Sequence, residues 1–388
     1  MRTAQALSPY RLALGKKVPN PLLPCHDGRR PSSLRSALHV DRSHASSPSL
    51  LSQDVTECLG NVPIVRLNRF GALTSTRNCY LKLESCNPGG SIKEKNALCL
   101  VQSAEQDGWL KPGGTIVESS SGNLGIGLAI VGAVRGYRVV IVIDQKTTPP
   151  FRRMLQAHGA ELVEVPASAA DASGSMQRAR MQKAKELAAE IPGAWYPCQH
   201  LNPLNPEAHF KFTAREIDRA FKGNLDGLVV GVSTGGQLTG LARYLRPRYP
   251  HLKIVAADVS GSSILGEPAH AYKMTGVGLA FRPPHLNYEA IHQGYNVPES
   301  LAYSVCHTLA KQEGMLLGAS TGVVVAAGLR LASELPKGSR ILMINADRGD
   351  RYLETVYNQE WLTANGFDLF SASELESQIL NLQALYPD

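Results

Sequence analysis

Apolar residues along the chain form short continuous runs that alternate with segments of helical periodicity. The runs predict strands at Tyr80–Leu83, Thr115–Glu118, Tyr137–Ile143, Glu161–Val165, Leu225–Val232, Lys253–Asp258 and Arg340–Asn345. The periodic segments predict helices at Leu124–Arg135, Arg152–His158, a polar-faced stretch ending near Glu190, Gln237–Tyr244, Pro298–Glu313 and Thr321–Glu334. Strands rich in Val, Ile and Leu that alternate with helices are typical of parallel sheets covered on both faces, so we expect an α/β fold.

Two such regions, separated near residue 200, predict two α/β lobes with a cleft between them. The 388 residues are enough for two domains, since a typical domain has about 100 to 200 residues. We expect a large lobe at 53–86 and 198–365, a smaller lobe at 87–197, and a carboxyl-terminal tail at 366–388.

Residues 1–52 are rich in Ser, Pro, Arg and His without a sustained period, which predicts a disordered or targeting-like extension. Of the net charge of +7, residues 1–50 carry +6, so the other 338 residues carry only +1 and are not expected to bind nucleic acid. No apolar run approaches the roughly 18 to 20 residues of a membrane span. The seven scattered cysteines are typical of reduced thiols, not of disulfides or a metal site. We expect a soluble cytoplasmic protein; an organelle transit peptide in residues 1–50 is the alternative.

Three loops that join a strand to a helix carry candidate chemistry. Gly231–Gln237 is rich in glycine, and converging N–H groups at a helix start suit an anion; taken alone, the loop is equally consistent with a plain turn. Ser119–Gly125 offers hydroxyls and an amide that suit either a carboxylate or a helix cap. Asn87–Lys95 (NPGGSIKEK) places Lys93 where an apolar strand gives way to a helix, so partial burial would lower its pKa, although most lysines are solvated. Lys95 is interpreted as an ordinary lysine.

The three loops together match the needs of pyridoxal 5′-phosphate, which requires a lysine for its aldehyde, a cradle for its phosphate and a site for the carboxylate of an amino acid. The loops resemble the lysine, substrate-carboxylate and phosphate motifs of the cysteine synthase family, the fold-type II pyridoxal-phosphate enzymes. Gln199–Pro203 (QHLNP) is similar to the QFxNP element of that family, and Gly318–Gly322 (GASTG) to the stretch that holds the pyridine nitrogen. The resemblance runs in order from about Thr56 to Leu362.

The resemblance implies a role for each matching residue. Lys93 would form the internal aldimine and, once freed by the substrate, would take the α-proton. The other implied cofactor contacts are Asn123, Ser233, Thr234, Gly235, Gly236, Gln237 and Ser320. The implied substrate contacts are Ser120, Ser121, Gly122 and Gln199. Gln237 stands where the family often has Thr or Ser, which leaves its backbone N–H as the expected phosphate ligand.

The resemblance implies β-replacement on an O-activated L-serine through an aminoacrylate intermediate. A serine hydroxyl at the pyridine nitrogen does not keep that nitrogen protonated as an Asp would, which favours loss of a β-leaving group. Within the family, five features resemble the synthases that make N-(2-amino-2-carboxyethyl)-L-glutamate for 2,3-diaminopropionate and siderophore biosynthesis: Leu124, Gly261–Gly266, Asp347–Leu353 (DRGDRYL), Val356–Tyr357 and Trp361–Leu362. That implies O-phospho-L-serine as donor and L-glutamate as nucleophile.

Phosphate release and a dicarboxylate substrate both call for cationic groups. The candidates are Lys146, Arg152, Arg153, Lys273 and Arg282, each of which is equally interpretable as a solvated charge. The DRGDRYL segment can equally be a structural ion-pair turn behind the cofactor.

Three alternatives remain open. A cysteine synthase or S-sulfocysteine synthase would share every cofactor residue and use sulfide or thiosulfate, with O-acetylserine or O-phosphoserine as donor. A cystathionine β-synthase-like enzyme would give Cys25 with His39 or His44 the role of haem ligands. A non-catalytic protein that retained the fold is the third. A homodimer is implied by the resemblance.

Overall fold

The computed structural model describes residues 51–70, 72–75, 77–170 and 176–386. The predictions for residues 1–50, which include the extension, the transit peptide and the haem ligands Cys25, His39 and His44, lie outside the described residues. No helix among the described residues is long and apolar enough to cross a membrane. The six cysteines described, Cys58, Cys79, Cys86, Cys99, Cys198 and Cys306, are free thiols.

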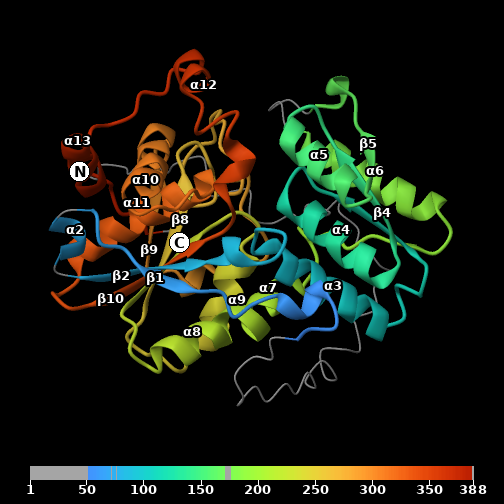
Figure 1. Cartoon of the computed structure of the whole chain (residues 1–388), viewed down its shortest axis with the longest axis horizontal. Coiled ribbons are helices and arrows are strands. Elements are labelled where there is room, and N and C mark those ends of the chain that lie inside the picture. Colours follow the sequence, from blue (N-terminus) through green and yellow to red (C-terminus); the bar gives the residue numbers. More distant parts are fainter. Residues whose placement is uncertain (1–50, 71, 76, 171–175, 387–388) are drawn as a thin grey trace, which may run out of the picture. The chain divides into compact units, whose positions relative to one another are not determined.

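The larger of two sheets has six strands in the order β1-β2-β10-β7-β8-β9 (Figure 1). Its strands are β1 Ile64–Arg66, β2 Asn78–Leu83, β7 Gly227–Gly231, β8 Lys253–Val259, β9 Gln293–Val297 and β10 Arg340–Asn345. Only the edge pair β1–β2 is antiparallel; all other pairings in this sheet are parallel. The carboxyl ends of the five parallel strands therefore meet at one edge, where loops can gather.

The smaller sheet has four parallel strands in the order β5-β4-β3-β6. Its strands are β3 Thr115–Ser119, β4 Arg138–Ile143, β5 Glu161–Glu164 and β6 Ala194–Trp195. Every residue of β3 is buried, which explains why the run TIVE reads as a continuous apolar strand although it contains a glutamate.

Helices cover both sheets. The α-helices are α2 Ala72–Ser75, α3 Lys93–Gln106, α4 Asn123–Arg135, α5 Pro149–Ala157, α6 Gln177–Glu190, α7 Asn205–Ala208, α8 Ala214–Phe221, α9 Gly236–Leu245, α10 Glu299–Gln312, α11 Ala319–Glu334, α12 Gln359–Ala364 and α13 Ala372–Leu380. The 3₁₀-helices are η2 Val55–Cys58, η3 Glu84–Cys86, η4 Ala167–Ala169, η6 Tyr288–Ala290 and η7 Gly349–Tyr352, and η5 His209–Thr213 is a π-helix. α4, α5 and α6 pack on the smaller sheet, and α11 packs on β7, β8 and β10 of the larger one (Figure 1).

The predicted α/β class is confirmed, as are all seven predicted strands and the six predicted helices, to within a few residues at their ends. The strands that the pattern missed, β1, β6 and β9, all lie at sheet edges. Edge strands pair with only one neighbouring strand, so they do not need a continuous apolar run. The segment predicted as a tail contains α13, whose Leu375 and Ile379 are buried and which packs against α10 and α11.

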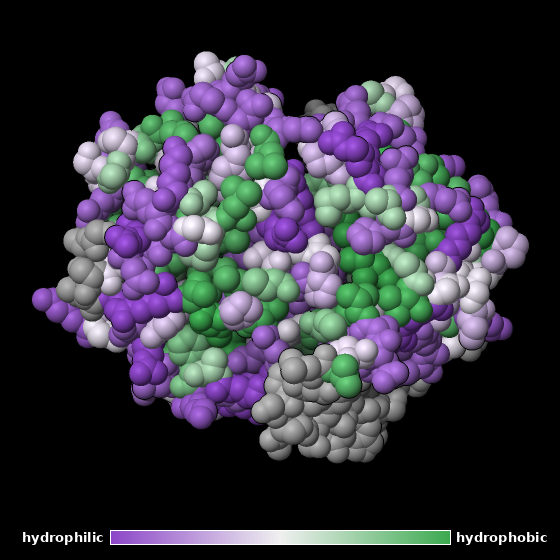
Figure 2. All heavy atoms as spheres, in the orientation of Figure 1, coloured by the Kyte–Doolittle hydropathy of each residue, from purple (hydrophilic) through white to green (hydrophobic). Residues whose placement is uncertain are grey.

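The surface mixes hydrophilic and hydrophobic residues. On the face seen in Figure 2, hydrophobic residues gather near the middle of the view and hydrophilic residues dominate its margin. Large hydrophobic side chains that are exposed include Trp109, Val134, Phe281, Leu316 and Leu353.

Candidate active site

Lys93 is the first residue of α3, as the sequence predicted. Its side chain is half-buried, and desolvation lowers the pKa of its ammonium to about 8. The loop before it is held by Glu94, whose carboxylate accepts hydrogen bonds from the backbone N–H of Gly89 (2.7 Å) and of Ser91 (2.9 Å). A lysine with a lowered pKa is a better nucleophile at neutral pH, which suits a Schiff base with an aldehyde.

Lys95 is not the ordinary lysine that the sequence suggested. Its side chain is fully buried, and its Nζ lies 2.8 Å from Glu84 Oε2 and 3.0 Å from Glu216 Oε1. Burial alone would lower its pKa, but the two carboxylates raise it. Lys82, also fully buried, contacts the same two glutamates, so two lysines and two glutamates form a neutral cluster under the Lys93 loop.

The glycine-rich loop joins β7 to α9, and Gly235 caps α9 with a left-handed backbone (φ +83°). A Cβ on Gly235 would lie 2.6 Å from the backbone nitrogen of Leu286, and a Cβ on Gly236 would lie 2.2 Å from Asn205 Oδ1. Both positions therefore require glycine. Beside them, Gln237 Nε2 is buried without a hydrogen-bond partner in the described residues. The backbone N–H groups of this loop lie at the start of a helix, where an anion is favoured, so the loop is suitable for a phosphate.

Asn205 connects this loop to two other parts of the site. Its Nδ2 donates to Thr234 Oγ1 (3.2 Å) and to the backbone oxygen of Gln199 (3.0 Å). Its Oδ1 accepts from Asn96 Nδ2 (2.9 Å), and Asn96 lies in the first turn of α3. Sequence reasoning missed Asn205, although it stands in the same NPLNP stretch as the predicted Gln199 element.

The serine loop joins β3 to α4. Ser120 Oγ accepts from the N–H of Gly125 in the first turn of α4 (3.1 Å), so this hydroxyl serves the helix start, the alternative that the sequence left open. Ser121 and Gly122 are half-buried beside it. Asn123 begins α4, and its side chain contacts the DRGDRYL segment, with Nδ2 2.8 Å from Asp347 Oδ2. The loop therefore combines a helix cap with polar groups that are available to a ligand.

The carboxyl edge of the smaller sheet carries a second polar cluster. The N–H of Gln199 donates to Glu118 Oε2 (3.3 Å) at the end of β3. Arg180, from the first turn of α6, is largely buried, and its Nε lies 3.0 Å from Asp144 Oδ2, just after β4. Next to Gln199, His200 lies 3.3 Å from the Gln177 amide. Burial, and then the positive charges of Arg180 and Lys93, lower the pKa of His200 to about 3. The sequence analysis did not single out Arg180, and it included His200 in the QHLNP element without giving it a role.

Ser320 lies in the first turn of α11 and is buried. The position of a Cβ on Gly276, which has a left-handed backbone, is 3.5 Å from Ser320 Oγ. The segment that contains Gly276 also reaches the glycine-rich loop, because the N–H of Gly278 donates to the Val232 backbone oxygen (2.9 Å). One segment therefore lies next to both Ser320 and the glycine-rich loop.

Several of the predicted cationic candidates are engaged in contacts of their own. Arg152 makes a bidentate pair with Glu164, both contacts at 2.7 Å, and Arg153 pairs with Glu354 at 3.1 Å. The guanidinium of Arg282 stacks 4.0 Å from the ring centroid of Tyr288. These contacts favour the interpretation of these arginines as surface structure.

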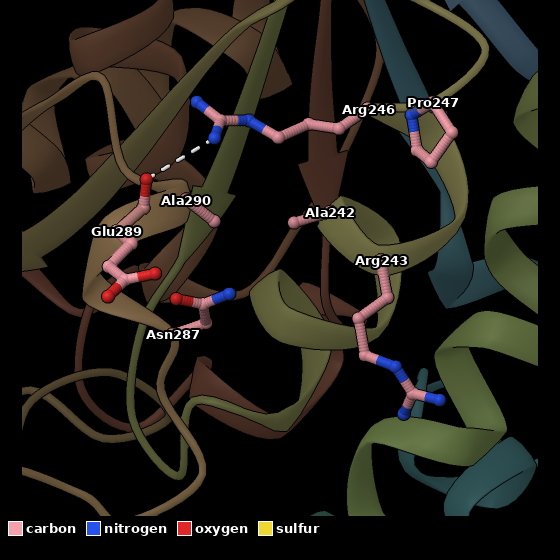
Figure 3. Close-up of a pocket in the computed structure, with 7 residues that line it drawn as sticks. All are labelled: Ala242, Arg243, Arg246, Pro247, Asn287, Glu289 and Ala290. Atoms are coloured by element: carbon pink, nitrogen blue, oxygen red, sulfur yellow. Dashed lines mark hydrogen bonds between the residues drawn. The ribbon is translucent and has the colours of Figure 1, made fainter.

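A separate pocket of about 240 Å³ contains none of the predicted site residues. Its lining is Ala242, Arg243, Arg246, Pro247, Asn287, Glu289 and Ala290. Figure 3 shows Arg246 reaching across it to the backbone oxygen of Glu289 (3.3 Å). The pocket lies against the carboxyl-terminal half of α9, whereas the glycine-rich loop precedes the first turn of that helix.

The sequence matches the family described as "Pyridoxal-phosphate dependent enzyme" over residues 55–347. The chain belongs to that family. A cysteine synthase of Staphylococcus aureus (strain N315) is 39% identical over 305 residues, which cover 78% of this chain and 96% of the relative. A cystathionine beta-synthase of Apis mellifera is 34% identical over 336 residues, which cover 85% of this chain and 66% of the relative.

Solved structures agree with this assignment. An O-acetylserine-dependent cystathionine beta-synthase from Helicobacter pylori has a TM-score of 0.74 and 31% identity, and covers 80% of this chain and 100% of its own. An O-ureido-L-serine synthase has a TM-score of 0.74 and 35% identity, and covers 84% of this chain and 99% of its own. The chain is therefore a fold-type II enzyme that uses pyridoxal 5′-phosphate and transfers a β-substituent. The crowded glycines and the unpartnered Gln237 Nε2 of the glycine-rich loop are features that fit the phosphate of this cofactor.

Proposed function

We propose that this enzyme replaces the phosphate of O-phospho-L-serine with the amine of L-glutamate, giving N-(2-amino-2-carboxyethyl)-L-glutamate, a precursor of 2,3-diaminopropionate in siderophore biosynthesis. The observation that carries the choice of donor is the largely buried Arg180 beside His200 at the carboxyl edge of the smaller sheet. The resemblance of DRGDRYL and the neighbouring features to synthases of this product supports the nucleophile.

A phosphate leaving group needs a cation more than an acetate group does, because it departs with more negative charge. Asp144 contacts the Nε of Arg180. The two terminal nitrogens of a guanidinium form a planar fork, which suits a bidentate contact with a phosphate. His200 is neutral at pH 7 in the ligand-free protein, and the charge of a bound phosphate would raise its pKa and strengthen its hydrogen bonding.

We assign the remaining roles to the residues for which the resemblance implies them. Lys93 would hold the cofactor's aldehyde and take the α-proton of the substrate, for which a pKa of about 8 is suitable. The cofactor, when bound, supplies the electron sink that makes this proton acidic. The proposed cofactor contacts are Asn123, Ser233, Thr234, Gly235, Gly236, Gln237 and Ser320. The proposed contacts with the substrate carboxylate are Ser120, Ser121, Gly122 and Gln199.

The decisive measurement pairs each donor with each nucleophile. Purified holoenzyme is given O-phospho-L-serine or O-acetylserine together with glutamate, sulfide or thiosulfate, and products are identified by mass spectrometry. We expect the glutamate adduct from O-phospho-L-serine. Sulfur-containing products alone would overturn the assignment in favour of a cysteine or S-sulfocysteine synthase, the second candidate, which the named cysteine synthase relatives favour.

A matched pair of variants tests the role of Arg180. Arg180→Gln should lower kcat/KM for O-phospho-L-serine about 100-fold, because it removes a buried charge worth roughly 2–5 kcal/mol to a phosphate. Its kcat/KM for O-acetylserine should change much less. Arg153→Gln, which removes an exposed arginine of the neighbouring helix α5, should leave both values within about twofold. Equal losses with both donors in Arg180→Gln would count against a phosphate contact.

We also propose the wider organisation that the resemblance implies: a large lobe at 53–86 and 198–365, a smaller lobe at 87–197, a homodimer and a cytoplasmic location. Exposed Trp109, Val134 and Phe281 supply apolar surface of the kind that dimers bury. Light scattering on the purified protein tests the dimer, and fractionation of cells tests the location.

A further inference from the structure

Asp347 lies where three loops of the site meet. It follows β10, a central strand of the larger sheet, and forms an isolated bridge with Ser91 in the Lys93 loop. Its backbone oxygen accepts from the N–H of Gly318 (3.0 Å), the residue that caps α11 two residues before Ser320. Its side chain reaches Asn123 at the start of α4. One residue therefore contacts the lysine loop, the serine loop and the Ser320 helix.

The Asp347 carboxylate is buried, and its two oxygens differ in their hydrogen bonding. Its Oδ2 accepts from Asn123 Nδ2 (2.8 Å) and from the Tyr352 hydroxyl (2.6 Å). Its Oδ1 is buried without a hydrogen-bond partner in the described residues, and a Cβ on Gly318 would lie only 1.8 Å from it. A buried carboxylate with an unsatisfied oxygen is costly. Arg348 and Asp350 form a separate, exposed ion pair in the same segment (3.2 Å).

Arg351 binds the oxygen of the Asn123 side-chain amide, whose nitrogen binds Asp347. Its Nη1 donates to Asn123 Oδ1, and its Nη2 donates to the backbone oxygen of Gly89. Arg351 is buried, and its guanidinium lies 5.9 Å from the Phe151 ring centroid. A guanidinium can only donate, and an ionised carboxylate can only accept. The Asn123 amide is therefore fixed with its oxygen towards Arg351 and its nitrogen towards Asp347.

This arrangement leaves one N–H of Asn123 uncommitted. We propose that Asp347 is a positioning residue that, together with Arg351, fixes the Asn123 amide so that its second N–H is presented to the 3′-oxygen of the bound cofactor. The inference rests on the proposed contact between Asn123 and that oxygen. A freely rotating amide would offer either its donor or its acceptor, whereas a fixed one favours the ionised 3′-oxygen that a donor binds best.

The test uses holoenzyme without substrates, so that it does not depend on the identity of donor or nucleophile. Asp347→Asn removes the charge at nearly constant shape, and Asp350→Asn makes the same change at an exposed acid three residues away. The measurements are the visible circular dichroism of the bound cofactor and its dissociation constant. Asp347→Asn should weaken cofactor binding about tenfold and alter the visible band, as loss of one charge-assisted hydrogen bond implies. Asp350→Asn should stay within about twofold of wild type.

A double variant separates positioning from a general structural role. If Asp347 acts through Asn123, then Asp347→Asn should add little to Asn123→Ala, because interacting residues are not additive. Fully additive effects would overturn the proposal, as would an unchanged visible band and dissociation constant in folded Asp347→Asn, even if its melting temperature fell. If Asn123→Ala itself leaves band and affinity unchanged, the contact between Asn123 and the cofactor is wrong, and the inference about Asp347 falls with it.

Discussion

Lys93 and Lys95 lie two residues apart in the first turn of α3, and their pKa values are shifted in opposite directions. Lys93 is half-buried, and desolvation lowers its pKa to about 8. Lys95 is fully buried, yet Glu84 and Glu216 raise its pKa. Successive residues on a helix point in different directions, about 100° apart. The comparison shows that burial alone does not decide the chemistry of a lysine; the presence of carboxylates does.

The largest difference between the two lysines should appear in catalysis. Lys93→Ala should lower activity by about 10³-fold or more and abolish the covalently attached cofactor, because this amine is proposed to hold the aldehyde and to carry the proton. Activity assays and the visible absorbance check the result. The unfolding midpoint of the apoprotein should not fall, and retention of the wild-type visible band by Lys93→Ala would show that another lysine is the attachment site.

The corresponding change at Lys95 should act on stability. Lys95→Met should lower the free energy of unfolding by about 3–5 kcal/mol, because it leaves the buried Glu84 and Glu216 short of a positive charge. Urea unfolding measures the loss. Adding Glu84→Gln restores neutrality to the cluster and should recover part of it. A Lys95→Met protein of wild-type stability would contradict the ion-pair interpretation.

The lowered pKa of Lys93 predicts a pH-dependent stability of the apoprotein. The pKa falls from 10.5 in the unfolded chain to about 8 in the folded one, so the unfolded state binds more protons between these values. The destabilisation caused by burying the charged ammonium of Lys93 is complete below about pH 8, and it disappears as the pH rises towards 10.5. Lys93→Met should therefore be more stable than wild type at pH 7 by about 1–3 kcal/mol, after allowance for partial exposure. Urea unfolding of both apoproteins at pH 7 and pH 10.5 checks this, and a gain that persists at the higher pH would exclude the titration of Lys93 as its cause.

The smallest effect is expected on a third face of the same helical turn. Asn96→Ala removes the hydrogen bond from Asn96 Nδ2 to Asn205 and should cost about 1 kcal/mol of stability, with a loss of only a few-fold in cofactor affinity. Thermal melting and fluorescence titration with the cofactor measure the two effects. Asn96→Asp is a useful comparison, since it retains shape but not the donor; full rescue by Asp would show that the bond is unimportant.

The sequence was sufficient for those parts of the protein whose cause is local. Buried parallel strands such as β3 and β10 are continuous apolar runs, and Lys93 stands in a motif of adjacent glycines and serine. The role of Lys95 depends on Glu216, 121 residues away, and that of Asn96 on Asn205, 109 residues away. Spacing along a chain carries no information about such pairs. A local signal was available for Lys95, because it lies on the same helical face as the buried Leu98 and Cys99.

Arg180 was not singled out by the sequence, and His200 and Asp347 were named only as members of motifs, for related reasons. Arg180 belongs to a helix with a polar sequence, so it resembles a solvated residue. Its contact with Asp144 arises only from the fold, which brings the end of β4 next to α6. His200 was read as part of a motif, and its low pKa arises from burial and from the charges of Arg180 and Lys93. The exposed pair Arg348–Asp350 does form an ion-pair turn, as the sequence allowed, whereas Asp347 and Arg351 face inward from the same segment.

The order of strands in the larger sheet has a consequence for synthesis. β10 lies between β2 and β7, although 256 residues separate the end of β2 at Leu83 from the start of β10 at Arg340. A growing chain therefore cannot join the two halves of this sheet until β10 has left the ribosome. Contacts so distant in sequence raise the contact order and slow folding. Until then β2 and β7 present unpaired edges, so we expect nascent chains truncated before Arg340 to depend on chaperones and to lack the cofactor site.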